Sequence, residues 1–148
     1  AIAGIDSLKA CARLGFSKIT LTTRKPVSGF KGNPYIQRRG IVLDQIKDET
    51  VIFEGTVDEA VQAFPQNINV AATLALATRS KDLITVRISA SPHLTKNSHE
   101  IEAVGDFGRV VTRTENAVCP DNPKTSYLAV LSGIETLKGY CSCIHIGT

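Results

Sequence analysis

The chain has 148 residues, a formal net charge of +3, and 43% hydrophobic residues. This length fits one domain that buries a core of its own, and no apolar run approaches the roughly 20 residues of a membrane span. The basic residues are scattered and have no aromatic residues interleaved with them, so we expect neither a nucleic-acid nor a membrane partner.

The four cysteines, Cys11, Cys119, Cys141 and Cys143, form no recognisable disulfide framework. Cys141 and Cys143 with nearby His145 suggest a metal, but a zinc site needs four ligands at wider pair spacing. We therefore predict no metal and reduced, structural thiols. Because the first residues show no secretory signal, we expect a cytoplasmic protein.

The first third of the chain predicts helices that alternate with strands. Ile2–Leu14 carries apolar side chains at helical spacing, and Lys18–Thr23 alternates as a strand does. The glycines and scattered charges of Val27–Arg39 predict a surface loop. A short helix over Gly40–Lys47 then leads to a strand at Thr50–Glu54.

The middle of the chain predicts two further helices. Thr56 and Glu59 match a capping box, so a helix begins there and ends before Pro65. Asn69 can cap the next helix, Val70–Arg79, whose alanines and leucines predict burial on more than one side.

The last third predicts a strand, a hairpin and a helix. Leu83–Ala90 is the strand, and His99–Val104 and Arg109–Thr114 form the hairpin. Pro123 suits the first turn of the final helix, where Tyr127 is predicted to be a core residue. The apolar stripe of that helix comprises Tyr127, Leu128, Leu131, Ile134 and Leu137. This order of elements predicts an α+β fold, an open mixed or antiparallel sheet with helices on one face.

Four short strings carry unusual polar or small residues: Ala1–Asp6, Pro65–Thr73, Ser91–Ile101 and Pro120–Leu128. The third contains Asn97 and His99, whose spacing puts both side chains on one face of an extended segment. Histidine has the unperturbed pKa nearest neutrality, so it can take and return a proton. From spacing alone, a structural histidine at a strand edge is slightly favoured over a catalytic one.

In this order the four strings resemble the C-terminal, substrate-side domain of the L-aspartate dehydrogenase family. The resemblance covers residues 1–140 and leaves 141–148 as a tail. That family joins this domain to an N-terminal Rossmann domain, and the chain has no G-x-G-x-x-G of its own. The chain is thus expected to be the second domain of a Rossmann-type dehydrogenase.

The resemblance implies oxidation of L-aspartate to iminoaspartate, which feeds quinolinate and NAD synthesis, with NAD or NADP as cofactor. The residue that reads the cofactor ribose belongs to the absent domain, so the sequence does not choose between the two. A homodimer formed through this domain is also implied, and an open sheet with a bare face favours such pairing.

The resemblance also assigns site residues. His99 is the catalytic histidine, and Ala3 and Asn69 are the cofactor contacts. A small residue at a helix start lets backbone amides approach a ligand, whereas Asn69 is otherwise a helix cap. Aspartate needs cationic or amide donors for two carboxylates. The candidates are Asn97, which is the best placed, Lys25, Lys124 and Thr125.

Two other functions remain open on the sequence. The chain can be a non-catalytic dimerisation or binding module, because it lacks a nucleotide-binding domain. It can also be the second domain of another amino-acid or semialdehyde dehydrogenase, although the strings Asn67–Thr73 and Asp121–Leu128 do not match dihydrodipicolinate reductase or homoserine dehydrogenase. A Rossmann sequence immediately upstream would exclude the binding module.

Overall fold

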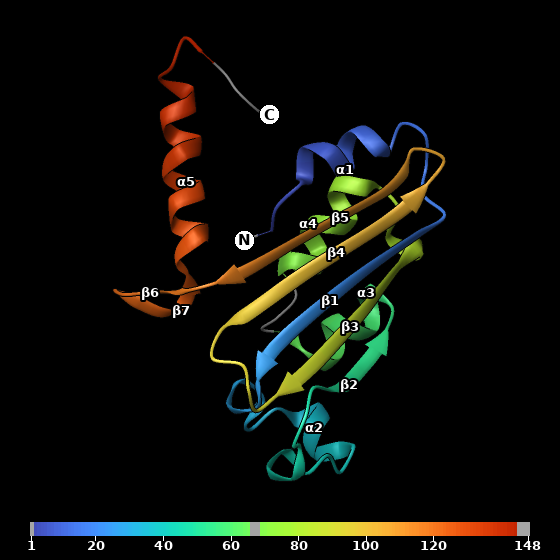
Figure 1. Cartoon of the computed structure of the whole chain (residues 1–148), viewed down its shortest axis with the longest axis vertical. Coiled ribbons are helices and arrows are strands. Elements are labelled where there is room, and N and C mark those ends of the chain that lie inside the picture. The colour runs from blue at the N-terminus through green and yellow to red at the C-terminus, as the bar shows by residue number, and fades with distance from the viewer. Residues whose placement is uncertain (1, 66–68, 145–148) are drawn as a thin grey trace.

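The computed structural model describes residues 2–65 and 69–144, without the side chains of Pro123 and Lys124. Its main body is a five-stranded mixed sheet in the order β2-β3-β1-β4-β5, with helices on one face (Figure 1). The strands are β1 (Lys18–Pro26), β2 (Thr50–Gly55), β3 (Ile84–Ser91), β4 (Asn97–Gly105) and β5 (Gly108–Asn116). Strand β1 is central, parallel to β3 and antiparallel to β4. The predicted α+β fold with an open mixed sheet is confirmed.

Alternation along the strands separates the two faces of the sheet. On β1, Leu21 and Thr23 point toward the helices, and the side chains between them point to the opposite face. The β4–β5 hairpin closes where Gly105 pairs with Gly108, which has a φ of 100°. This hairpin was predicted from the same alternation and is confirmed.

Three helices cover one face of the sheet: α1 (Ile5–Cys11), α3 (Val57–Ala63) and α4 (Asn69–Thr78). The predicted capping box of α3 is present, since the Thr56 amide donates to Glu59 Oε2 at 2.8 Å and Glu59 N donates to Thr56 Oγ1 at 3.3 Å. On α4, Leu74 is fully buried whereas Leu76 is 80% exposed. The predicted burial of α4 on several sides is wrong, because this helix lies in an outer layer with one face toward solvent.

The segment predicted as a loop over Val27–Arg39 contains two short helices. The first is a 3-10 turn at Val27–Phe30, and the second is α2 (Pro34–Arg38). Asn33 begins α2, because its Oδ1 accepts from the amides of Tyr35 at 2.8 Å and Ile36 at 3.3 Å. Asn followed by Pro is favourable at a helix N-terminus, and this local signal explains why part of the predicted loop is helical.

Two further 3-10 turns connect the strands. The helix predicted over Gly40–Lys47 is one such turn at Leu43–Gln45, and a second at Lys81–Leu83 leads into β3.

The C-terminal part lies apart from the main sheet. Strands β6 (Val118–Cys119) and β7 (Asn122–Ser126) pair with each other, and α5 (Tyr127–Tyr140) follows and stands off the body in Figure 1. Pro123 is therefore in a strand, and α5 begins after Ser126, whose hydroxyl accepts from Ala129 N at 3.3 Å.

The apolar stripe of α5 is not covered by the rest of the described chain. Tyr127, predicted to be core, is 42% exposed, and Leu137 is 69% exposed. The prediction that Tyr127 is a core residue is wrong, because this helix faces away from the sheet (Figure 1). Within residues 2–65 and 69–144, no helix has the length and apolar character of a membrane span.

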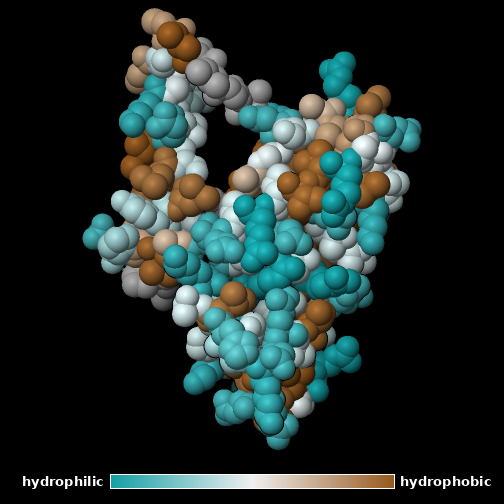
Figure 2. All heavy atoms as spheres, in the orientation of Figure 1, coloured by the Kyte–Doolittle hydropathy of each residue, from teal (hydrophilic) through white to brown (hydrophobic). Residues whose placement is uncertain are grey.

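The face of the sheet opposite the helices is charged rather than apolar. Arg24 Nε lies 2.9 Å from Glu49 Oε1, and Arg24 Nη1 lies 3.3 Å from Glu100 Oε2. Arg109 Nε lies 2.6 Å from Glu102 Oε1. Figure 2 shows hydrophilic side chains across the middle of this face, and hydrophobic ones in its upper part and along α5. These exposed ion pairs contribute little to stability. A sheet face covered by charged side chains can nevertheless stay in contact with water. A bare sheet face is therefore no argument for dimer formation here.

Candidate functional site

His99 lies on the helix side of β4, directly opposite Thr23 of β1. Antiparallel pairing matches Thr23 with His99, and the His99 ring is partly buried. Thr23 Oγ1 lies 3.1 Å from His99 Nδ1, which is hydrogen-bond distance. Asn97 comes two residues earlier on the same extended strand, so its side chain shares the face of His99.

The electrostatic environment of His99 keeps the imidazole neutral. Burial lowers its pKa from the ordinary 6.5 to about 4, and the positive charge of Lys25 adds to this effect. Burial also lowers the pKa of Lys25, which lies two residues after Thr23 on the same side of β1. A carboxylate bound beside these groups would favour their charged forms. The site is thus suited to an anionic ligand.

The segment Ala3–Gly4 contacts β5, the strand next to the one that carries His99. The Thr112 hydroxyl of β5 donates to the Ala3 carbonyl at 3.2 Å, and Thr112 is the cross-strand partner of Ile101. Gly4 has a φ of 79°, and a Cβ there would lie 2.5 Å from Thr112 Cγ2. Glycine therefore permits this close approach, which holds Ala3 on the helix side of the sheet.

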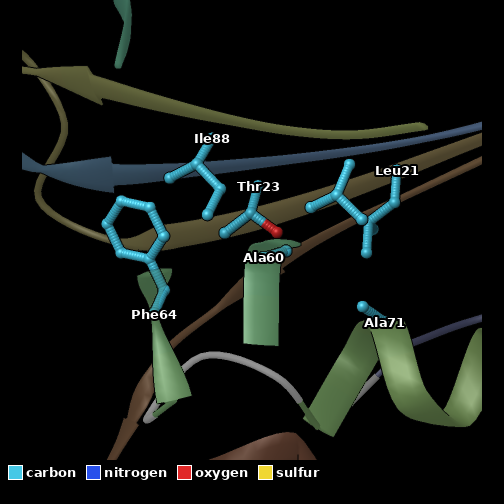
Figure 3. Close-up of a pocket in the computed structure, with 7 residues that line it drawn as sticks. Leu21, Thr23, Ala60, Phe64, Ala71 and Ile88 are labelled. Carbon is cyan, nitrogen blue, oxygen red and sulfur yellow. The ribbon is translucent and has the colours of Figure 1, made fainter. Parts of the chain in front are cut away.

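Asn69 is the first residue of α4, and its side chain is exposed. Ala71, one half-turn further along α4, packs with Thr23 around a small apolar cavity (Figure 3). The start of α4 therefore lies on the same side of the sheet as His99. Residues 66–68, which belong to the same sequence string, are outside the described part of the chain.

Lys124 and Thr125 lie in β7 rather than at a helix start. This strand is connected to the site through Asn116, which pairs with Asn97 and accepts a hydrogen bond at Oδ1 from Ser126 at 3.3 Å. Thr125 is partly buried. The structure therefore gathers Lys25, Asn97, His99 and the segment after Thr125 at one end of β4.

Two residues of this region were missed by the sequence argument. Thr23 contacts His99, and Asn116 has a buried Nδ2 for which the described residues provide no hydrogen-bond acceptor. Both come from strands next to β4, so no motif around His99 could reveal them. Only the strand register places them beside it.

His99 lines neither of two cavities in the described chain. The cavity beside Thr23 has a volume of about 10 Å³, room for a single water. An open groove of about 310 Å³ lies elsewhere, between α2, β2 and α3, and includes Tyr35, Arg39 and Glu59. None of the predicted site residues lines that groove.

His93, the other histidine within the described residues, is not at this site. The His93 side chain is 73% exposed, and its Nε2 lies 3.7 Å from Asp48 Oδ1. His145 lies outside the described residues, as do Ala1 and the end of the predicted tail.

Comparison with known proteins gives consistent matches over the whole chain. The family model described as aspartate dehydrogenase, C-terminal, matches residues 6–140. The L-aspartate dehydrogenase of Methanosarcina mazei is 50% identical over 148 residues, which cover 100% of this chain and 55% of that protein. The L-aspartate dehydrogenase of Nitrosopumilus maritimus is 47% identical over 149 residues, covering 100% of this chain and 54% of that protein.

A solved structure agrees with these matches. The crystal structure of aspartate dehydrogenase from Thermotoga maritima superposes with a TM-score of 0.73 at 29% identity, covering 99% of this chain and 53% of that one. The chain spans about half the length of the relatives it matches. The sequence strings, the fold and these matches agree, and the chain belongs to the aspartate dehydrogenase C-terminal domain family.

Proposed function

We propose that this chain is the substrate-binding and catalytic part of an NAD(P)-dependent L-aspartate dehydrogenase, which oxidises L-aspartate to iminoaspartate. The main support is the setting of His99, a neutral imidazole in contact with Thr23 and near the partly buried amine of Lys25. This combination occurs in a chain whose family relatives are named for aspartate oxidation. Iminoaspartate would then serve NAD synthesis in the cytoplasm, where the free thiols of the described cysteines are stable.

The residues of this domain would bind and orient aspartate. Loss of hydride from Cα leaves a carbon–nitrogen double bond, so the amine and both carboxylates must be held in one geometry. Lys25 can attract one carboxylate, and the Asn97 amide can donate to the other. His99 lies opposite Thr23, two residues from Lys25 along β1 and two residues from Asn97 along β4, and it can orient the substrate beside these two groups.

The residues present fit only the nicotinamide end of a cofactor. Ala3 is exposed and held against β5, and Asn69 is exposed at the start of α4, so both can approach a flat ring. The 148-residue sequence contains no glycine-rich phosphate loop, so the remaining contacts would come from a Rossmann domain. Bound NAD or NADP would accept the hydride.

We propose that the apolar stripe of α5 packs against the nucleotide-binding half of the enzyme. The relatives are nearly twice as long as this chain, and α5 presents an uncovered apolar stripe away from the sheet. The stripe comprises Tyr127, Leu128, Leu131, Ile134 and Leu137, which recur at helical spacing. Such a stripe is normally buried against another element.

We also propose that the enzyme is a homodimer assembled through this domain, as the family resemblance implies. Light scattering of the isolated chain at high concentration should give twice the monomer mass. A monomeric mass at every concentration would contradict this assembly.

The activity is testable in a fusion of this chain to the nucleotide-binding half of the Methanosarcina mazei relative, whose matching segment is 50% identical. We expect L-aspartate to drive the formation of reduced nicotinamide. Homoserine and aspartate semialdehyde are the control substrates for the other dehydrogenases considered. A folded fusion that oxidises either of these in preference to aspartate would exclude the proposed substrate.

The remaining alternative is a non-catalytic binding module, and no observation on the described residues favours it. A folded fusion that binds NAD but oxidises none of the three substrates would support that alternative.

A further inference from the structure

Thr23 is a buried threonine in contact with the candidate catalytic histidine. Its side chain is 4% exposed, and Oγ1 lies 3.1 Å from His99 Nδ1. Figure 3 shows Thr23 on the helix side of the sheet, between Leu21 and Ile88 and facing Ala60 of α3. The contact follows from the antiparallel register of β1 and β4, which places the two residues directly opposite each other.

The surroundings of Thr23 determine where the hydroxyl proton goes. A hydroxyl donates one hydrogen bond, and a buried donor without an acceptor is costly. The cavity beside Thr23 is lined by apolar side chains, and the hydrogen-bond partner that the structure records for Oγ1 within the described chain is His99 Nδ1. The hydroxyl is thus best satisfied when it donates to Nδ1.

This donation specifies the tautomer of the ring. In a neutral imidazole one nitrogen accepts and the other carries the proton. With Nδ1 as the acceptor, the proton is on Nε2. The low pKa of His99 agrees with a neutral ring but does not select between its tautomers.

We infer that Thr23 is a positioning residue that holds His99 as the Nε2–H tautomer and fixes the orientation of its ring. In the resting enzyme His99 then offers a hydrogen-bond donor, which suits an oxygen of an anionic substrate. It does not offer a lone pair that could accept a proton from an amine. The inference about the tautomer concerns this chain alone, and the inference about substrate orientation rests on the proposed function.

The tautomer is measurable in the 148-residue chain by nitrogen-15 NMR of the histidine rings at neutral pH. The spectrum of a His99→Asn variant identifies the His99 signals, and exposed His93 is the internal reference. We expect the Nε2–H pattern in the wild-type chain and in Thr23→Ser, which keeps the hydroxyl. Thr23→Val, which has nearly the same shape but no donor, should give a mixture of tautomers. An Nδ1–H pattern in the wild-type chain would overturn the inference, as would identical spectra for wild type and Thr23→Val.

Kinetics of the fusion enzyme test the positioning role. Thr23→Val should lower kcat/KM for aspartate about tenfold, the equivalent of one lost hydrogen bond, and Thr23→Ser should restore most of it. Thr22→Val is the matched control, because Thr22 is also buried on β1 but faces the opposite side, where it pairs with Glu100. Equal losses in Thr22→Val and Thr23→Val would indicate a structural effect and contradict the role of Thr23. A wild-type fusion that fails to oxidise aspartate would refute the proposed function, while the NMR result would still decide the tautomer.

Discussion

Replacing His99 with alanine in the complete enzyme is expected to lower turnover by roughly a hundredfold or more, the usual contribution of a placed polar or acid–base group. The ring is partly buried on the helix side of β4, and its Nδ1 lies at hydrogen-bond distance, 3.1 Å, from Thr23 Oγ1. Alanine leaves the Thr23 hydroxyl without its acceptor, which costs about 1–3 kcal/mol of stability. We expect the fold to survive this loss, because the substitution does not remove a side chain from the fully buried core.

Two other variants make the measurement specific. His93→Ala should have little effect, since His93 is 73% exposed and lies outside the site. Asn97→Ala should mainly raise the KM for aspartate if the Asn97 amide binds a carboxylate in both the ground state and the transition state. Steady-state kinetics of the three variants decide the assignment. A crippled His93→Ala enzyme beside a near-normal His99→Ala enzyme would show that the catalytic assignment is wrong.

The pH dependence of His99 has a definite sign. Because burial lowers its pKa from 6.5 to about 4, the ring is neutral in the folded chain at pH values where it would already be charged in the unfolded chain. The stability associated with this neutral ring is present above pH 6.5 and is lost as the pH falls toward 4. The free energy of unfolding of His99→Asn should therefore vary less with pH over this range than that of the wild-type chain.

The isolated chain is expected to bind NAD weakly or not at all, and to oxidise no aspartate without its nucleotide-binding half. A dinucleotide is normally held by a glycine-rich turn and the N-terminus of the following helix, and the sequence lacks that motif. The two proposed contacts, Ala3 and Asn69, are both exposed, and the cavity beside Thr23 has room for only about one water. These residues can touch a nicotinamide ring but cannot hold the phosphates.

Calorimetry of the isolated chain with NAD, and then with NADP, measures this directly. The fusion protein is the positive control, because it should bind one of the two cofactors and turn over aspartate. Micromolar affinity for either cofactor in the isolated chain would contradict the expectation. It would mean that phosphate contacts exist which the sequence motif does not reveal.

Local structure and the family of this protein were largely determined by the sequence itself. Alternation in Lys18–Thr23 and Leu83–Ala90 predicted β1 and β3, and the Thr56–Glu59 capping box predicted the start of α3. These signals are readable because each depends on side chains a few residues apart. The Asn97 and His99 pair singled out the candidate site for a similar reason, since two positions on one strand share a face.

Only the tertiary structure decided which strands are neighbours and which side chains meet. Thr23 and His99 are 76 residues apart, and their contact depends on β1 lying between β3 and β4 in one particular register. Alternation predicts the face of a residue but not its partner, because a strand can pair with any other exposed edge. The exposure of α5 was hidden for a related reason. An apolar stripe on a helix indicates that another element covers it. The stripe does not show which element that is, because the partner lies elsewhere in the fold or in another domain.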